Sequence, residues 1–148
     1  MTSNPIYELF KTQKSFGPFL LRMLLAAVFF LHGSQKAFGW FGGDGWTATI
    51  DSWSSPEGLG LSPFLAAMAI IAELLSAIAL FFGLFTRLAA LAVAGVMIGA
   101  IVLVHADAGF VSAEYPFALL MVGLSLAFTG GGRLSMDRSI SSLLMPSY

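Results

Sequence analysis

The chain has 148 residues, of which 57% are hydrophobic and only 10% are charged, and its formal net charge is −1. Because a soluble domain carries roughly 25% charged residues, these charges could not cover the surface of a water-soluble globule of this size. The composition therefore excludes a soluble cytoplasmic enzyme and a disordered tail, and the lack of a basic patch excludes a nucleic-acid binder.

Four apolar segments are long enough to cross a bilayer, which takes about 20 helical residues. They predict an all-α fold, an integral membrane four-helix bundle without a separate soluble domain, with helices at about 16–38, 63–85, 87–105 and 115–129. The fourth segment is short, so we expect either a thinner bilayer there or a helix that extends into neighbouring residues. The first segment is too long for a signal peptide and lacks a small-residue cleavage pattern, so we interpret it as a retained helix.

The basic residues predict the orientation of the bundle. With four spans, one side of the membrane holds six of them: Lys11, Lys14, Arg22, Arg87, Arg133 and Arg138. The opposite loops hold mostly acidic residues. Because basic residues are retained on the cytoplasmic side, we expect a multi-pass protein of the inner (cytoplasmic) cell membrane. Both termini would be cytoplasmic, including a short C-terminal tail over 130–148.

The outer loop, 39–62, contains all three tryptophans. Trp46, Ile50 and Trp53 are spaced i, i+4, i+7, which predicts a short helix lying in the outer interface. Its aromatic side chains would either anchor the protein in the interface or form a lid over a site that opens to the outer leaflet.

The third segment contains Gly95 and Gly99 in a GxxxG pattern, which lets helix backbones approach closely. We expect this face to pack inside the bundle, with contact against a second copy of the chain as the alternative.

Glu73 lies about 15 Å into the second helix at 1.5 Å per residue, near the midplane of the bilayer. An ionisable side chain there costs roughly 2.5–3.5 kcal/mol on insertion scales, so it is expected to face the bundle interior and to have a partner. Glu73 would serve as a proton-relay or ligand-binding carboxylate, or would pair with an Arg or Lys to fix the bundle; the two roles are compatible.

The first helix supplies candidate partners for Glu73. Arg22, His32 and Lys36 fall within an arc of about 80° on that helix, so they form one polar stripe. The stripe predicts the lining of a polar cavity, with anchoring at the interface as the alternative.

His105 ends the third helix on the same side of the membrane as His32, and Asp107 follows it. Two histidines on one face are typical of hydrogen bonding to a quinone carbonyl or of axial haem ligation, although His105 could simply cap the last carbonyls of its helix. Trp40 and Tyr115 lie close by in the same outer region. Loosely placed carboxylates beside two histidines make a metal site the weaker interpretation, and we predict none.

The pattern of these residues resembles the DoxX family of small four-helix membrane proteins. The resemblance covers about 16–138 and rests on motifs in chain order: Arg22, His32-Gly33, Lys36, Glu73, Gly83-Leu84, Thr86-Arg87, His105 and the stretch from Gly130 to Asp137. It implies a four-helix bundle with a polar site at Arg22, His32, Lys36, Glu73 and His105. It further implies that Ser135 and Asp137 form a helix N-cap, with pairing to Arg87 or Arg133.

For some members, this resemblance implies a subunit of a quinone-linked oxidoreductase in sulfur metabolism, and for others a membrane partner of redox or stress-defence enzymes. Our first hypothesis is therefore a bundle that binds a quinone. Its catalytic residues would be Glu73, His105 and His32, and its ligand-binding residues Arg22, His32, Lys36, Trp40, Glu73, His105 and Tyr115. The chain has no cysteine, so it offers no thiol for redox chemistry and is not expected to be a complete enzyme.

The second hypothesis is a non-catalytic partner or scaffold of a redox or stress-defence complex. In that case the buried charges hold the bundle together, and the outer loop or the tail docks a partner oxidoreductase subunit or a second copy. Transport is a third, minor interpretation that rests only on the buried charge.

Overall fold

The computed structural model describes residues 5–105 and 109–144, and this part of the chain contains helices and no strands. The helices in chain order are α1 (Pro5–Phe10), α2 (Gly17–Phe38), the 3₁₀ turn η1 (Trp40–Gly42), α3 (Gly45–Ser54), α4 (Pro63–Phe82), α5 (Thr86–Val104), α6 (Phe110–Thr129) and α7 (Met136–Leu144).

Helices α2, α4, α5 and α6 are each long and apolar enough to cross a membrane. The protein is therefore an all-α membrane protein with four spanning helices, as the sequence predicts. Helix α4 ends at Phe82 rather than at 85, because Gly83 adopts a left-handed conformation and caps the helix. Helix α6 begins at Phe110 rather than at 115, with Pro116 inside it; of the two expectations for the short fourth segment, the extended helix is found.

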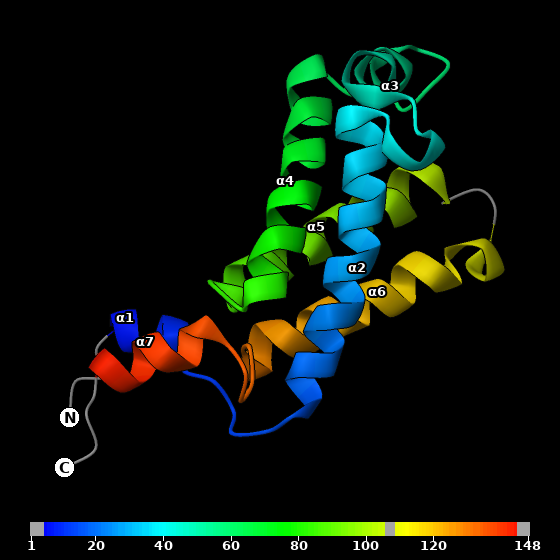
Figure 1. Ribbon diagram of the computed structural model, residues 1–148. Helices are drawn as coiled ribbons and strands as arrows, with labels where there is room; N and C mark the ends of the chain where they lie inside the picture. The colour runs from blue at the N-terminus through cyan, green and yellow to red at the C-terminus, as the bar shows by residue number, and fades with distance from the viewer. Residues whose placement is uncertain (1–4, 106–108, 145–148) are drawn as a thin grey trace.

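The four spans pack as two antiparallel pairs, α2 against α4 and α5 against α6, and α4 also contacts α5 (Figure 1). The core between them consists of small and aliphatic side chains with one aromatic ring, among them Leu25, Phe29, Ala77, Leu80, Ala90, Val93 and Leu126. Gly33 of α2 lies so close to α4 that an added Cβ would stand 3.2 Å from the backbone nitrogen of Leu74. The absence of a side chain there lets the first pair of helices approach closely.

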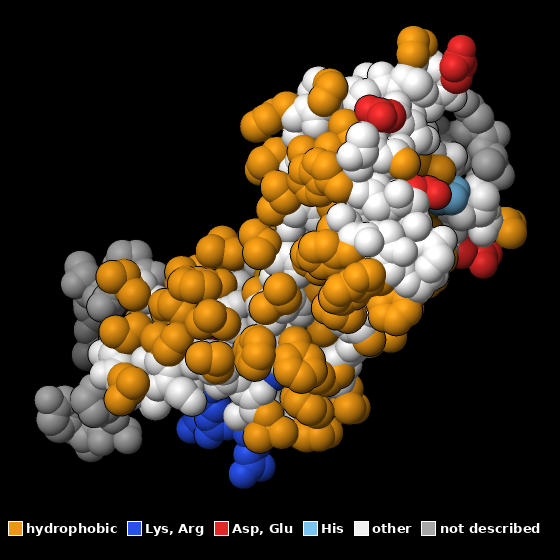
Figure 2. All heavy atoms as spheres, turned by 45° about the horizontal axis from the view of Figure 1, so that its top comes forward, with side chains coloured by type: hydrophobic (Ala, Val, Ile, Leu, Met, Phe, Trp, Pro, Cys, Tyr) orange, Lys and Arg blue, Asp and Glu red, His pale blue; other side chains and the backbone are white. Residues whose placement is uncertain are grey.

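Hydrophobic side chains cover the long helices on the face that Figure 2 shows, with Lys and Arg at one end and most Asp and Glu at the other. Exposed apolar residues such as Leu75, Leu91 and Phe128 would be unfavourable in water. Because the lipid interior is as apolar as these side chains, the surface fits a bilayer environment.

Arg22 lies at the end of the bundle that also holds α1 and α7. Its side chain is 1% exposed, and its guanidinium donates hydrogen bonds to four backbone carbonyls. Two of these are the last carbonyls of α4, Leu80 at 2.5 Å and Phe81 at 3.0 Å, and the others belong to Gly131 and Leu134. Arg22 therefore caps α4 and ties the segment after α6 to the first span.

Asp137 closes the same end of the bundle. Its carboxylate accepts hydrogen bonds from the backbone nitrogens of Phe85 at 2.7 Å and Thr86 at 2.8 Å, at the start of α5. The expected pairing with Arg87 or Arg133 is wrong. Asp137 is 1% exposed; the free N–H groups at the start of α5 bind its carboxylate directly, and the opposite charge that acts on it is the buried guanidinium of Arg22.

Two further expectations for this segment concern the N-cap at Ser135 and the partner of Arg87. Ser135 is the N-cap of α7, since its Oγ accepts a hydrogen bond from the backbone nitrogen of Arg138 at 3.3 Å. Arg87 instead donates to the carbonyls of Lys11 and Ala127. The predicted tail at 130–148 thus contains a helix, which lies beside α1 (Figure 1).

Gly95 and Gly99 do not pack against any of the helices that the structure describes, so the expectation of internal packing is wrong. A Cβ added at either glycine would meet nothing within 4 Å. Both residues instead line a groove between α4 and α5, which belong to different helix pairs.

Candidate functional site

A cavity of about 180 Å³ lies between the first and second pairs of helices, in the half that contains the C-terminal ends of α2 and α5. Five of the side chains that the sequence singled out line it: His32, Lys36, Glu73, His105 and Tyr115. They come from four helices or their ends, and the stripe on α2 supplies two of them. The rest of the wall is formed by Val28, Phe29, Met97, Ala100, Pro116 and Leu119.

Lys36 and Glu73 form an ion pair at this cavity. The Lys36 Nζ lies 2.6 Å from each carboxylate oxygen of Glu73, whose side chain is 4% exposed, whereas that of Lys36 is 26% exposed. The ammonium group also lies 5.1 Å from the centre of the Trp53 ring, a cation–π contact. One amine therefore joins α2, α3 and α4, and the buried carboxylate has the partner that its depth requires.

His32, His105 and Tyr115 line the cavity without hydrogen-bond partners among the described residues. Each imidazole carries one donor and one acceptor when neutral, and the phenol can do both. Tyr115 is 55% exposed and both histidines are partly exposed, so their free donors and acceptors are accessible. The cavity thus offers hydrogen-bonding groups to a ligand with oxygen acceptors or donors. The structure does not describe Asp107.

Arg22 and Trp40 are not brought to this cavity. Arg22 binds backbone carbonyls at the opposite end of α2, and Trp40 is 52% exposed on η1, with its ring centre 4.9 Å from that of Phe38. The sequence placed Arg22 on the correct face of the helix, but 14 residues separate it from Lys36, about 21 Å at 1.5 Å per residue.

The structure has a helix, α3, where the outer loop was expected to form one. Trp46 is exposed, as an interfacial anchor would be, whereas Trp53 is half-buried and packs on Lys36. Sequence reasoning did not place Met97 or Ala100 in the site, and it related Trp53 to the site only through the alternative of a lid. Only the depth of Lys36 near a Trp-rich loop could have indicated the contact with Trp53.

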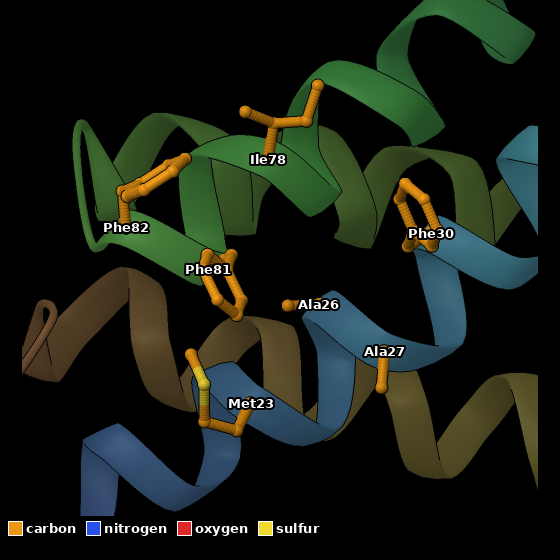
Figure 3. A pocket seen from close by; sticks show the side chains of 7 residues that line it. All are labelled: Met23, Ala26, Ala27, Phe30, Ile78, Phe81 and Phe82. Carbon is orange, nitrogen blue, oxygen red and sulfur yellow. The ribbon is translucent and has the colours of Figure 1, made fainter.

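Two apolar grooves accompany the polar cavity. One, of about 540 Å³, lies between α4 and α5 below α3, and it shares Lys36, Glu73, Met97 and Ala100 with the cavity. The other, of about 530 Å³, lies between α2 and α4 and is lined by Met23, Ala26, Ala27, Phe30, Ile78, Phe81 and Phe82 (Figure 3). The second groove has no polar side chain, so it offers no group for chemistry.

The polar cavity by itself has room for a single ring, since its volume is about 180 Å³ and an engineered cavity of about 150 Å³ holds a benzene ring. Within the described ranges, no cluster of three or more His, Cys, Asp or Glu side chains could hold a metal ion.

The fold and this site define a class: small four-span membrane proteins with a polar cavity between the two helix pairs. The model of the DoxX family matches residues 17–106, which run from α2 through α5 and include His32, Lys36, Glu73 and His105. The chain belongs to the DoxX family.

The chain is also similar to a curated protein of Bacillus subtilis (strain 168) whose name is "Putative oxidoreductase CatD". The two are 37% identical over 127 residues, which cover 84% of this chain and 88% of that protein. No solved structure matches the chain.

Proposed function

We propose that this protein is a quinone-interacting subunit of a membrane oxidoreductase, and that the quinone ring binds in the polar cavity. The observation that carries this proposal is the set of unpaired His32, His105 and Tyr115 side chains beside the Lys36–Glu73 pair. A quinone ring carries two carbonyl oxygens that accept hydrogen bonds at its opposite ends. Membership of the DoxX family and a relative named as an oxidoreductase support a redox role.

The size and walls of the cavity support a single-ring headgroup. Its volume of about 180 Å³ exceeds the roughly 150 Å³ that holds benzene. Phe29, Met97 and Leu119 supply apolar contacts for the faces of a ring, and the polar groups are few. Cofactor sites commonly have this composition, apolar walls with a small number of polar groups that fix the orientation.

Reduction of a quinone to a quinol consumes two electrons and two protons, and each carbonyl becomes a hydroxyl. The electrons come from a partner oxidoreductase subunit. His32 and His105 donate hydrogen bonds to the carbonyl oxygens, and Lys36 stabilises the negative charge that develops there. One of the two protons passes from the Lys36 ammonium, which is reprotonated from water by way of Glu73, its partner at 2.6 Å. The other proton passes from His32 or His105, which is likewise reprotonated from water.

The proposed location is the inner cell membrane, with both termini in the cytoplasm. The separation of basic and acidic side chains at the two ends of the bundle supports this orientation (Figure 2). The cavity then lies towards the outer leaflet.

The test measures binding of a soluble benzoquinone analogue to the purified protein in lipid nanodiscs, read from quenching of Trp fluorescence. Glu73→Gln and His105→Leu should each weaken binding about tenfold, the equivalent of one charge-assisted hydrogen bond. Glu57→Gln, an exposed acid of the outer loop, is the matched control and should bind normally. A wild-type protein that binds no analogue would refute the proposal. Variants that lose stability and complex assembly, but no affinity, would favour a scaffold.

A further inference from the structure

We infer that the quinone bound by this protein carries a long aliphatic tail, and that this tail lies in the groove between α4 and α5. The inference rests on the proposed function, since it names the class of molecule that the same site takes.

The groove and the polar cavity adjoin each other. Both are lined by Lys36, Glu73, Met97 and Ala100, so the ion pair stands where the two meet. A molecule with its ring among His32, His105 and Tyr115 would reach the groove by passing beside the pair. The cavity, of about 180 Å³, is the smaller space and suits a ring, whereas the groove, of about 540 Å³, is large enough for a long chain.

The chemistry of the groove fits a hydrocarbon chain. Apart from the ion pair at the junction, its lining consists of Trp53, aliphatic side chains, Met, Ala and Gly. Leu65, Met68, Leu103 and Val104 line it and are each about half exposed, so the groove opens towards the surrounding lipid. A tailed molecule could therefore enter sideways from the bilayer, without passing through water.

Gly95 and Gly99 keep this groove wide. Both line it, and a Cβ at either position would meet nothing within 4 Å. Their lack of a side chain serves no contact between helices of this chain, so a leucine there would extend into the groove instead of disrupting the fold.

The groove in Figure 3 provides a matched comparison. It has almost the same volume, about 530 Å³, and its lining is entirely apolar, but it shares no lining residue with the polar cavity. It can hold a lipid chain, but it cannot hold the tail of a molecule whose ring occupies the cavity. This difference separates specific tail binding from general contact with lipid.

The experiment compares two quinones with the same ring, one without a tail and one with a ten-carbon tail, in nanodiscs. Affinities are expressed per concentration in the lipid phase, so that partition of the tail into the bilayer is not counted as binding to the protein. Gly99→Leu should weaken binding of the tailed quinone about tenfold and leave the tailless quinone unaffected. Ala27→Leu, in the groove of Figure 3, should change neither affinity.

A photoreactive group at the end of the tail gives a second measurement. It should label peptides of α4 and α5 that line the groove, including Met68 and Gly95. If the tailless quinone binds but Gly99→Leu has no effect and labelling falls elsewhere, the inference fails and the proposed function stands. If neither quinone binds, both fail. If Gly99→Leu converts a dimer into a monomer, a second copy covers the groove and the inference is wrong.

Discussion

The ammonium group of Lys36 contacts both carboxylate oxygens of Glu73 at 2.6 Å, and the two residues come from different spans. The contact joins α2 to α4 at the point where the polar cavity meets the groove between α4 and α5. A buried pair of this kind can hold the bundle together and also bind a ligand oxygen. An ammonium has three donors, so one remains for a ligand while Glu73 is bound.

The two residues of this pair should contribute unequally to stability. Lys36→Met leaves a nearly inaccessible carboxylate without its cation and should lower the free energy of unfolding by about 3 kcal/mol. Glu73→Gln should cost less, about 1 kcal/mol, because Lys36 is partly exposed and keeps its contact with Trp53. Thermal unfolding in detergent measures both. The double variant should cost less than the sum of the single variants, and strict additivity would contradict a direct pair.

Asp137 should be needed for the start of α5. Asp137→Ala removes the acceptor for two buried backbone N–H groups, those of Phe85 and Thr86, and should cost about 1–2 kcal/mol. Asp44 is the control: it stands at the N-cap of α3 but makes no capping hydrogen bond, so Asp44→Ala should stay within about 0.5 kcal/mol. Equal losses in the two variants would contradict this role.

Gly83 and Gly60 allow backbone strain to be separated from steric overlap. Both have positive φ, +66° and +61°, so Gly→Ala should cost each about 1 kcal/mol in strain. A Cβ at Gly83 would also lie 2.5 Å from the Arg22 guanidinium and 2.6 Å from Ser135, whereas at Gly60 it would meet nothing. Gly83→Ala should therefore cost about 1–3 kcal/mol more. If the unfolding curves of the two variants coincide, the Arg22 guanidinium is not held beside Gly83.

The orientation can be measured directly, because the chain has no cysteine of its own. We expect Glu57→Cys, in the outer loop, to react with an impermeant maleimide on intact spheroplasts. Ser139→Cys, on the exposed side of α7, should react only after the membrane is permeabilised. The reverse pattern would show that the termini lie outside the cytoplasm.

The sequence predicted the four spans because a run of apolar residues is sufficient to specify a membrane helix. Its three candidate partners for Glu73, which were Arg22, His32 and Lys36, include the residue that forms the ion pair, Lys36. The convergence of His32, His105 and Tyr115 on one cavity agrees with their common position near the outer ends of the spans.

The rest of the structure depends on tertiary contacts that carry no signal in a single sequence. Helical periodicity assigns Arg22 to a face of α2, but only the return of the chain after α6 brings the carbonyls of Gly131 and Leu134 to it. In the same way, a GxxxG pattern marks a face with small residues. Whether Gly95 and Gly99 contact a helix or border a groove depends on the angle at which α4 and α5 separate.

The hydrogen bonds of Arg22 also have a consequence for the order of synthesis. Two of its acceptors, Gly131 and Leu134, follow it by 109 and 112 residues. Until residues 131–134 are synthesised, the Arg22 guanidinium can bind only the two α4 carbonyls, those of Leu80 and Phe81. All four spans precede the remaining acceptors in the chain. A chain that ended just before Gly131 and had left the ribosome would contain every span but would stay open at the end that Arg22 closes.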